Sequence, residues 1–382
     1  MNYTQDNCIK IAKRYNNVKR SYLLVNPLQA KHVPVSPTKS LRMMQTLGDR
    51  LADKYPHTEL VVGFAETATA IGAVVASRLP QCFYIHTTRE VLKKDYACVN
   101  FSEEHSHATE QKLCITEFEK ALARTNCVIF VDDEISTGKT LLNIITQLRA
   151  EFPVLSEKTI VVASIVNRLA PADEQRLTEA QIFSEQLIKI PHEDYSAQVA
   201  GFGTQAPLPV NRDADMGFKA LTVNGRQLLG EPRVGVFADS YFAACRTLAE
   251  QLLETLSDWD ERVEDVLILG TEECMCPALI LGSEIEKAMP ELNVYCHSTT
   301  RSPISICNEG DYPIKNGYQI SSFYDGKRLT YVYNTRRYDK VIIVTDGGLN
   351  CDNAYEEICA IFSGQGCKDF MIIKGIGNVQ FL

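Results

Sequence analysis

Short apolar runs alternate with amphipathic stretches along most of the 382 residues. Six of these runs predict buried strands, and most of them are followed by turn residues: residues 60–62, 128–131, 160–165, 266–269, 341–344 and 370–373. After Thr140 the apolar positions fall on one helical face, as shown by Leu141, Ile144, Ile145 and Leu148. The alternation predicts an α/β protein whose parallel sheets are flanked by helices.

The alternation stops between residues 197 and 233, where glycine, proline, asparagine and aspartate replace the apolar runs. We place a domain junction there. The predicted organisation is a first domain at 1–200, a linker at 201–231 and a second α/β domain at 232–382. A long insertion within one domain is the alternative, because this stretch could also wrap an active site.

The two halves of the chain repeat one pattern of motifs. GFAE, YIHTTR and VDD occur in that order at 63–66, 84–89 and 131–133, and GTEE, YCHSTTR and VTD follow at 270–273, 295–301 and 344–346. Arg89 precedes Asp132 by 43 residues, and Arg301 precedes Asp346 by 45. The shared order and spacing predict that the second domain is a degenerate copy of the first.

Composition narrows the classes of function. The net charge of −9 disfavours binding to nucleic acid, whose phosphates an acidic surface repels, but it is compatible with a small phosphorylated substrate. Thirteen cysteines form no CxxC pair, so we expect mostly buried or inert thiols in a reduced, cytoplasmic protein. The sequence has neither a run of about 18 apolar residues that could span a membrane nor a signal-like N-terminus.

Residues 128–140, VIFVDDEISTGKT, carry the most specific chemistry. Backbone N–H groups in a glycine turn that begins a helix bind phosphate, and threonine hydroxyls add donors. Asp132 and Asp133 would repel that phosphate, but they suit vicinal hydroxyls or a bound cation. A nucleotide-binding P-loop would need glycine where Asp133 stands. The segment therefore predicts a site for ribose 5-phosphate.

This segment resembles the phosphoribosyl-diphosphate (PRPP) signature of type I phosphoribosyltransferases, and residues 20–200 are similar to that family in the order of their motifs. The resemblance implies that Asp132 and Asp133 hold the ribose hydroxyls, beside Mg²⁺ bound to the ribose and the pyrophosphate. It places the 5′-phosphate on Ser136, Thr137, Gly138, Lys139 and Thr140. It places the pyrophosphate on a loop made of Gly63, Phe64, Ala65, Glu66 and Thr67, together with the catalytic Arg89.

Two further segments match parts of the family with less specificity. Residues 91–111 stand where the family has a mobile loop that closes over the site, which makes Lys93 and His105 catalytic candidates; a solvated loop explains them equally well. Lys31 and His32 stand where orotate phosphoribosyltransferases have an N-terminal segment known as the hood. These two residues could contact the base, or they could belong to a plain polar loop. Ser136 replaces the aspartate of 6-oxopurine salvage members, which speaks against hypoxanthine or guanine.

Residues 300–303 spell Thr-Arg-Ser-Pro, and the second half resembles the domain family named after that tetrapeptide (TRSP). Such domains typically follow an orotate-type phosphoribosyltransferase in bacterial gene clusters for tellurite resistance and stress. The resemblance implies transfer of a phosphoribosyl group from PRPP, with Mg²⁺, to an orotate-like or other nitrogenous acceptor. Pyrophosphate would be released and a nucleoside-like metabolite formed. A homodimer is compatible with it. A catalytically silent sensor of PRPP or nucleotides, or an enzyme with a different acceptor, remains the alternative.

Overall fold

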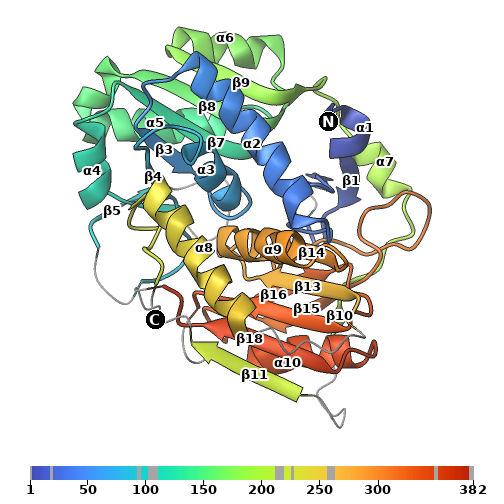
Figure 1. The fold of residues 1–382 in the computed structure, drawn as a ribbon. Coiled ribbons are helices and arrows are strands. Elements are labelled where there is room, and N and C mark those ends of the chain that lie inside the picture. Colours follow the sequence, from blue (N-terminus) through green and yellow to red (C-terminus); the bar gives the residue numbers. More distant parts are fainter. Residues whose placement is uncertain are drawn as a thin grey trace. The chain divides into compact units, whose positions relative to one another are not determined.

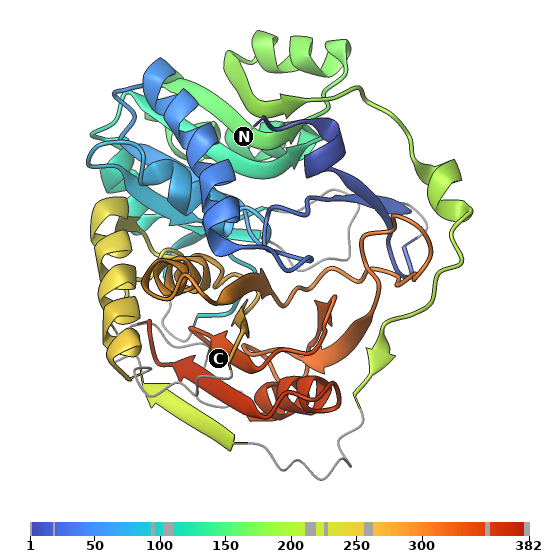
Figure 2. The same ribbon diagram turned by 45° about the vertical axis from the view of Figure 1, so that its right-hand side comes forward.

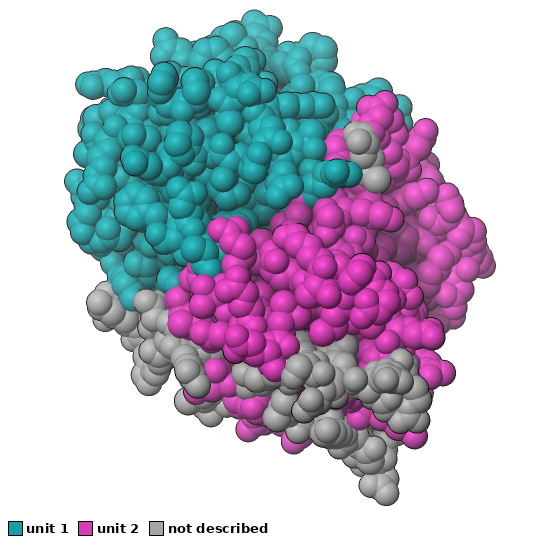
Figure 3. Space-filling view, viewed as in Figure 1, with its two compact units in different colours: residues 1, 42–193, 230–243 teal, residues 2–41, 194–229, 244–382 magenta. Residues whose placement is uncertain are grey.

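The computed structural model describes residues 2–17, 20–92, 96–101, 111–210, 219–224, 228–255, 263–347 and 352–377. The chain divides into two compact units (Figure 3). Apart from Met1, the first unit comprises residues 42–193 and 230–243, and the second comprises 2–41, 194–229 and 244–382. Each unit thus contains segments from both halves of the sequence, whereas the predicted domains are consecutive along the chain.

The first unit is built on a six-stranded sheet with the order β12-β4-β3-β7-β8-β9. All neighbouring pairs are parallel except the edge strand β12, which is antiparallel to β4. The strands are β3 (Leu60–Gly63), β4 (Phe83–His86), β7 (Cys127–Ile135), β8 (Thr159–Asn167), β9 (Ile182–Lys189) and β12 (Val236–Phe237). Their apolar residues are buried because helices cover the parallel sheet.

The other elements of the first unit follow from the same patterns. Leu141, Ile144, Ile145 and Leu148 are buried on one face of a single helix, as predicted. The elements are α3 (Thr69–Ala76), α4 (Thr116–Leu122), α5 (Lys139–Glu151), the short 3-10 helix Pro153–Glu157, α6 (Pro171–Glu179) and the hairpin β5 (Cys98–Phe101) and β6 (Gln111–Cys114). Helix α2 (Pro37–Lys54) begins in residues of the second unit and continues into the first.

The second unit contains a parallel five-stranded sheet with the order β11-β18-β17-β13-β14. In Figure 1, α9 lies over β13 and β14, and Figure 2 shows β11 beside β18 at one edge. The strands are β11 (Lys219–Asn224), β13 (Asp265–Gly270), β14 (Asn293–Ser298), β17 (Lys340–Val344) and β18 (Asp369–Lys374). The helices are α1 (Gln5–Cys8), α7 (Ser196–Ala200), α8 (Ala238–Thr255, which begins in the first unit), α9 (Cys276–Ala288) and α10 (Asp352–Ser363).

Two smaller sheets complete the second unit. One pairs β1 (Lys10–Lys13) with β2 (Tyr22–Val25), and the other has the order β10-β15-β16. The strands of the second are β10 (Leu208–Pro209), β15 (Gly317–Ser321) and β16 (Leu329–Tyr333). Among the helices that the structure describes, none combines the length and apolarity needed to cross a membrane.

The two large sheets have the same order of equivalent strands, which agrees with the repeat in the sequence. The order β4-β3-β7-β8 in the first sheet corresponds to β14-β13-β17-β18 in the second. In both copies an antiparallel hairpin, β5–β6 or β15–β16, separates the second parallel strand from the third. The copies differ at one edge, because β9 follows β8 along the chain whereas β11 precedes its whole sheet.

The edge strands explain why the units are not consecutive along the chain. Val35 pairs antiparallel with Cys296 of β14, and Val236 pairs antiparallel with Tyr84 of β4. In both copies a helix begins two residues later, α2 at Pro37 and α8 at Ala238. Each half of the sequence therefore supplies an antiparallel edge segment to the sheet formed mainly by the other half. Propensity and periodicity cannot show such an exchange.

Candidate active site

The carboxyl ends of β3, β4 and β7 bring the predicted site residues together. Gly63 is in register with His86 on one side and with Val131 on the other. The loops that follow these three strands therefore start side by side, at the edge of a parallel sheet where ligands bind in α/β proteins.

The loop at 63–67 is held by its neighbours. The N–H group of Ala65 donates to the hydroxyl oxygen of Thr87 (2.9 Å), and this hydroxyl donates to Oε1 of Gln111 (2.8 Å). The N–H group of Phe64 donates to the carbonyl oxygen of Val131 (3.0 Å). The peptide bond between Ala65 and Glu66 is cis, which the sequence does not reveal. Thr87 and Gln111 were not predicted as site residues, although the repeated Thr-Thr-Arg motif contains the first of them.

Asp132 and Asp133 are predicted to hold the ribose hydroxyls, and we call this pair the diol clamp. Both lie within the last residues of β7. The Thr67 hydroxyl donates to Oδ1 of Asp133 (2.8 Å), which ties the clamp to the 63–67 loop. Burial raises the pKa of Asp132 well above its usual range, and the adjacent charge of Asp133 raises it further. Two adjacent carboxylates repel each other, so a cation or two hydroxyl donors would stabilise the pair. Glu134 instead faces Arg168, whose Nη1 lies 3.5 Å from its carboxylate.

The turn after β7 contains a glycine in the left-handed region and leads directly into a helix. Gly138 has φ of +66° and directly precedes α5, whose amide of Leu142 donates to the Gly138 carbonyl (2.9 Å). Ser136, Lys139 and Thr140 are exposed around it. The first turn of a helix leaves N–H groups without intrahelical partners, so they are available to an anion.

Replacing Gly138 with alanine should raise the KM for PRPP and cost about 1–2 kcal/mol of stability, because side chains are strained at this positive φ. The new Cβ would also lie 3.3 Å from Cδ2 of Leu169. Gly326→Ala is a matched control, since nothing lies within 4 Å of a Cβ there. Steady-state kinetics and thermal unfolding check this. Equal effects of the two substitutions would show that the turn has no special role.

Arg89 follows Thr88, which exchanges two backbone hydrogen bonds of 2.8 Å with Lys112 of β6. Arg89 is partly buried, and the bond from the Thr87 N–H to the Gly63 carbonyl (2.9 Å) ties the backbone two residues before it to the 63–67 loop. The candidates Lys93 and His105 lie outside the described residues.

Lys31 and His32 belong to the second unit, where they have other partners. Lys31 is fully buried, and its ammonium group donates to the carbonyl oxygens of Glu272 (2.7 Å) and Thr299 (3.0 Å). His32 is also buried, and its ring lies edge-on to Tyr333. A buried ammonium group needs such oxygens. In this structure the ammonium group of Lys31 serves the second unit, and a contact of Lys31 or His32 with a base stays a prediction.

The second unit repeats the backbone of the site. The N–H group of Glu272 donates to the hydroxyl of Thr299 (3.0 Å), as that of Ala65 does to Thr87, and Thr300 pairs with Tyr331 as Thr88 does with Lys112. Gly270 is in register with Ser298 and Val344, so Arg301 is the counterpart of Arg89 and Asp346 that of Asp133.

The side chains of this second copy differ from those of the first. Glu272, the counterpart of Ala65, is fully buried, and its carboxylate accepts from Nε of Arg301 (3.1 Å), Nη2 of Arg328 (2.5 Å) and the Ser322 hydroxyl (2.5 Å). Thr345 replaces Asp132, and Asp346 accepts from the hydroxyl of Tyr324. The second copy therefore carries its own carboxylate against the arginine that corresponds to Arg89.

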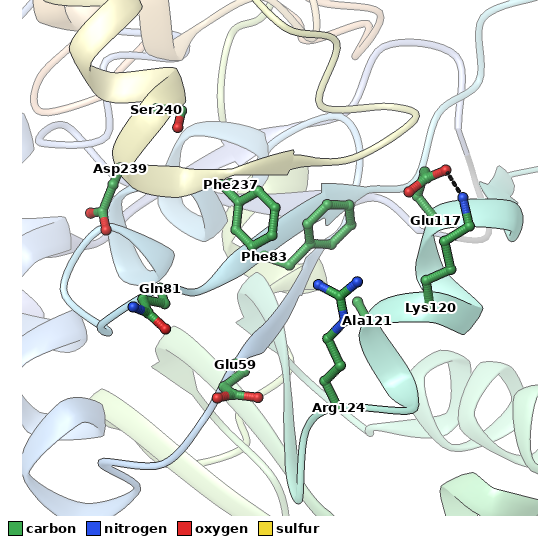
Figure 4. A pocket seen from close by; sticks show the side chains of 10 residues that line it. All are labelled: Glu59, Gln81, Phe83, Glu117, Lys120, Ala121, Arg124, Phe237, Asp239 and Ser240. Carbon is green, nitrogen blue, oxygen red and sulfur yellow. Dashed lines mark hydrogen bonds and ion pairs between the residues drawn. The ribbon is translucent and has the colours of Figure 1, made fainter.

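A cavity of about 490 Å³ lies elsewhere in the first unit (Figure 4). Its lining includes Glu59 just before β3, Phe83 at the start of β4 and Arg124 before β7. The rings of Phe83 and Phe237 meet edge-on there, and Lys120 pairs with Glu117 (2.6 Å). These residues mark the amino ends of the strands, so the cavity is separate from the candidate site at their carboxyl ends.

Two family models match this chain. Residues 8–192 match the phosphoribosyl transferase family, and residues 233–362 match the TRSP domain that stands C-terminal to it. None of the curated proteins matches the sequence.

Solved structures that match part of this chain include adenine and orotate phosphoribosyltransferases. The adenine enzyme from Trypanosoma brucei is 16% identical, with a TM-score of 0.35, over 48% of this chain and 76% of that one. The one from Giardia lamblia is 15% identical, with a TM-score of 0.34, over 48% and 94%. The orotate enzyme from Aeropyrum pernix is 16% identical, with a TM-score of 0.27, over 40% and 73%.

These identities and TM-scores are too low to carry an argument, so the assignment rests on the family models. The chain therefore contains a phosphoribosyl transferase domain in residues 8–192, followed by a TRSP domain in residues 233–362.

Proposed function

We propose that the first unit transfers the phosphoribosyl group of PRPP to a nitrogenous acceptor and releases pyrophosphate. The observation that carries the proposal is the convergence of three different binding elements at one sheet edge. They are the backbone loop at 63–67, the carboxylate pair of Asp132 and Asp133, and the glycine turn before α5.

Each element suits one part of PRPP. The N–H groups around Gly138 and the hydroxyls of Thr137 and Thr140 would bind the 5′-phosphate. Asp132 and Asp133 would accept hydrogen bonds from the 2′ and 3′ hydroxyls of the ribose. The 63–67 loop and the guanidinium group of Arg89 would bind the pyrophosphate, which a planar guanidinium can contact with two parallel hydrogen bonds.

The donor set also fits Mg²⁺, which prefers oxygen ligands and keeps several waters. Among the residues that the structure describes, no group of three His, Cys, Asp or Glu side chains could hold a metal ion. Asp132 and Asp133 would therefore share the ion with oxygens of the substrate and with water. When bound, the ion would neutralise charge on the departing pyrophosphate.

The remaining chemistry belongs to the residues themselves. As the bond from ribose C1 to pyrophosphate breaks, positive charge develops on the sugar, and the carboxylates of Asp132 and Asp133 stabilise that charge. Arg89 stabilises the negative charge of the leaving group. Ser136 stands where 6-oxopurine enzymes have an aspartate, which favours an orotate-like base or an amine over hypoxanthine or guanine.

The experiment that tests this proposal is pyrophosphate release from PRPP and Mg²⁺ with a panel of nucleobases, orotate analogues and amines. Release that depends on one class of acceptor supports the proposal and identifies the acceptor. Saturable binding of PRPP, measured by calorimetry, without release for any acceptor would favour a PRPP sensor instead.

Replacing Arg89 with alanine should lower kcat/KM for PRPP by about 10²–10³-fold, because it removes a donor aimed at the leaving group. Arg89→Lys keeps the charge but not the two parallel hydrogen bonds and should recover part of the loss. Arg78→Ala is the matched control, since Arg78 is an exposed arginine of the same unit that pairs with Asp49 (2.6 Å). Equal kinetics for Arg89→Ala and Arg78→Ala would remove Arg89 from the site.

A further inference from the structure

The hairpin β5–β6 places two cysteines directly opposite each other. Cys98 is in register with Cys114, and their Sγ atoms lie 3.2 Å apart. The N–H group of Ile115 donates to the carbonyl of Ala97 (2.9 Å), so residues 97 and 115 form a hydrogen-bonded pair. In an antiparallel ladder the next pair, Cys98 and Cys114, is then a non-hydrogen-bonded pair, where side chains approach most closely.

This position has the geometry that a disulfide needs. The Cα atoms of a non-hydrogen-bonded pair lie about 4.5 Å apart, within the range of about 4.4–6.8 Å that a disulfide spans. The sulfur atoms need to move by only about 1 Å to reach bonding distance. The hairpin backbone can therefore keep its pairing when the bond forms.

Cys98 is also accessible and activated. Among the twelve cysteines that the structure describes, Cys98 is partly exposed and the other eleven are buried. The thiol of Cys114 donates to Cys98 and lowers the pKa of Cys98 to about 7, and Lys112 lowers it further. A thiolate at neutral pH is the reactive form of cysteine. The inert behaviour expected for the thiols therefore has an exception at Cys98.

We propose that Cys98 and Cys114 are an oxidation site, which a peroxide converts to a reversible intramolecular disulfide. The thiolate of Cys98 attacks hydrogen peroxide, forming an S–O bond and breaking the O–O bond; the hydroxide released takes up a proton. The sulfur of Cys114 then attacks the sulfenic acid, forming the S–S bond and releasing the second oxygen as water with the thiol proton. The two cysteines lose two electrons, and the peroxide gains them.

The pair lies on the hairpin that supports the candidate site. Gln111 of β6 accepts the hydrogen bond from Thr87, which in turn holds the N–H group of Ala65. Lys112 exchanges both backbone bonds with Thr88, next to Arg89. A disulfide here would cross-link the strand that supports the 63–67 loop. The oxidation itself is independent of the proposed reaction, and its test does not use activity.

Tryptic digestion separates the two cysteines, because Lys112 lies between them. The full chain is treated with equimolar hydrogen peroxide, alkylated and digested. The expected product joins peptides 95–112 and 113–120, is lighter by two hydrogen atoms than their sum, and disappears after treatment with dithiothreitol. Without peroxide, iodoacetamide should label Cys98 at least about tenfold faster than the buried cysteines.

The variant Cys114→Ser tests the order of events. It lacks the resolving thiol, so peptide 95–112 should instead carry a dimedone adduct of the sulfenic acid at Cys98. Oxidation of other cysteines without the cross-linked peptide would overturn the proposal. Labelling of Cys98 no faster than the buried thiols would do the same.

Discussion

Replacing Asp132 and Asp133 together with asparagine should abolish pyrophosphate release from PRPP, lowering turnover by at least about 10³-fold. Both side chains keep their size, but the clamp loses the negative charges that would stabilise the developing cationic sugar. The amide groups also lose the acceptor capacity that two carboxylates offer to vicinal hydroxyls and a cation. Steady-state kinetics with the accepted substrate measure the loss.

The stability of this double variant separates function from folding. Burial and the neighbouring charge raise the pKa of Asp132, so the ionised pair is unfavourable in the folded protein at neutral pH. Neutral side chains remove that cost, and the thermal unfolding midpoint should stay the same or rise. Activity lost together with an unchanged or higher midpoint would locate the defect in the chemistry.

Asp346→Asn is the matched control, because Asp346 occupies the position in the second sheet that Asp133 occupies in the first. We expect the turnover of Asp346→Asn to stay within about twofold of the turnover of the unmodified protein. The reason is that the second copy has Thr345 where the first has Asp132, so it lacks the pair of acids. An unchanged rate in the Asp132 and Asp133 double variant would refute the site assignment. A large loss in Asp346→Asn would transfer the chemistry to the second copy.

Replacing Glu272 with alanine should destabilise the second unit by about 3–5 kcal/mol, the usual cost of removing one partner of a buried ion pair. Glu272 is fully buried, and its carboxylate accepts from Arg301, Arg328 and the Ser322 hydroxyl. Without it, the largely buried guanidinium groups of Arg301 and Arg328 lose the carboxylate that both of them contact. Urea unfolding followed by circular dichroism measures the change.

Glu272→Gln keeps one acceptor oxygen and should lose less stability than Glu272→Ala. Added pyrophosphate provides a second measurement on Glu272→Ala. If the carboxylate of Glu272 occupies the place of an anion against Arg301, millimolar pyrophosphate should recover part of the lost stability. Equal stability of Glu272→Ala and the unmodified protein would contradict the buried network.

Much of the fold could be predicted from local patterns. The six apolar runs are all strands in the structure, and the helix after Thr140 buries the predicted face. Repeated motifs around Arg89 and Arg301 indicated two related sheets, and the strand orders agree. Parallel strands buried on both faces must be apolar throughout, so their sequences are distinctive.

The candidate site could be predicted where one contiguous segment supplies the chemistry, as in 128–140. Contacts between distant segments were not accessible in this way. The support of Ala65 by Thr87 and Gln111 joins three loops, and the burial of Lys31 against Glu272 and Thr299 spans about 240 to 270 residues. No spacing rule relates such positions.

The sequence by itself determined the α/β class, the repeat and the glycine turn that follows two acids, because short-range periodicity and backbone chemistry specify them. The tertiary structure alone decided which half of the chain completes each sheet, and that Glu272 fills the second copy with its own carboxylate. The physical reason is that edge pairing and ion pairing depend on which surfaces meet, whereas strands and turns depend on neighbours along the chain.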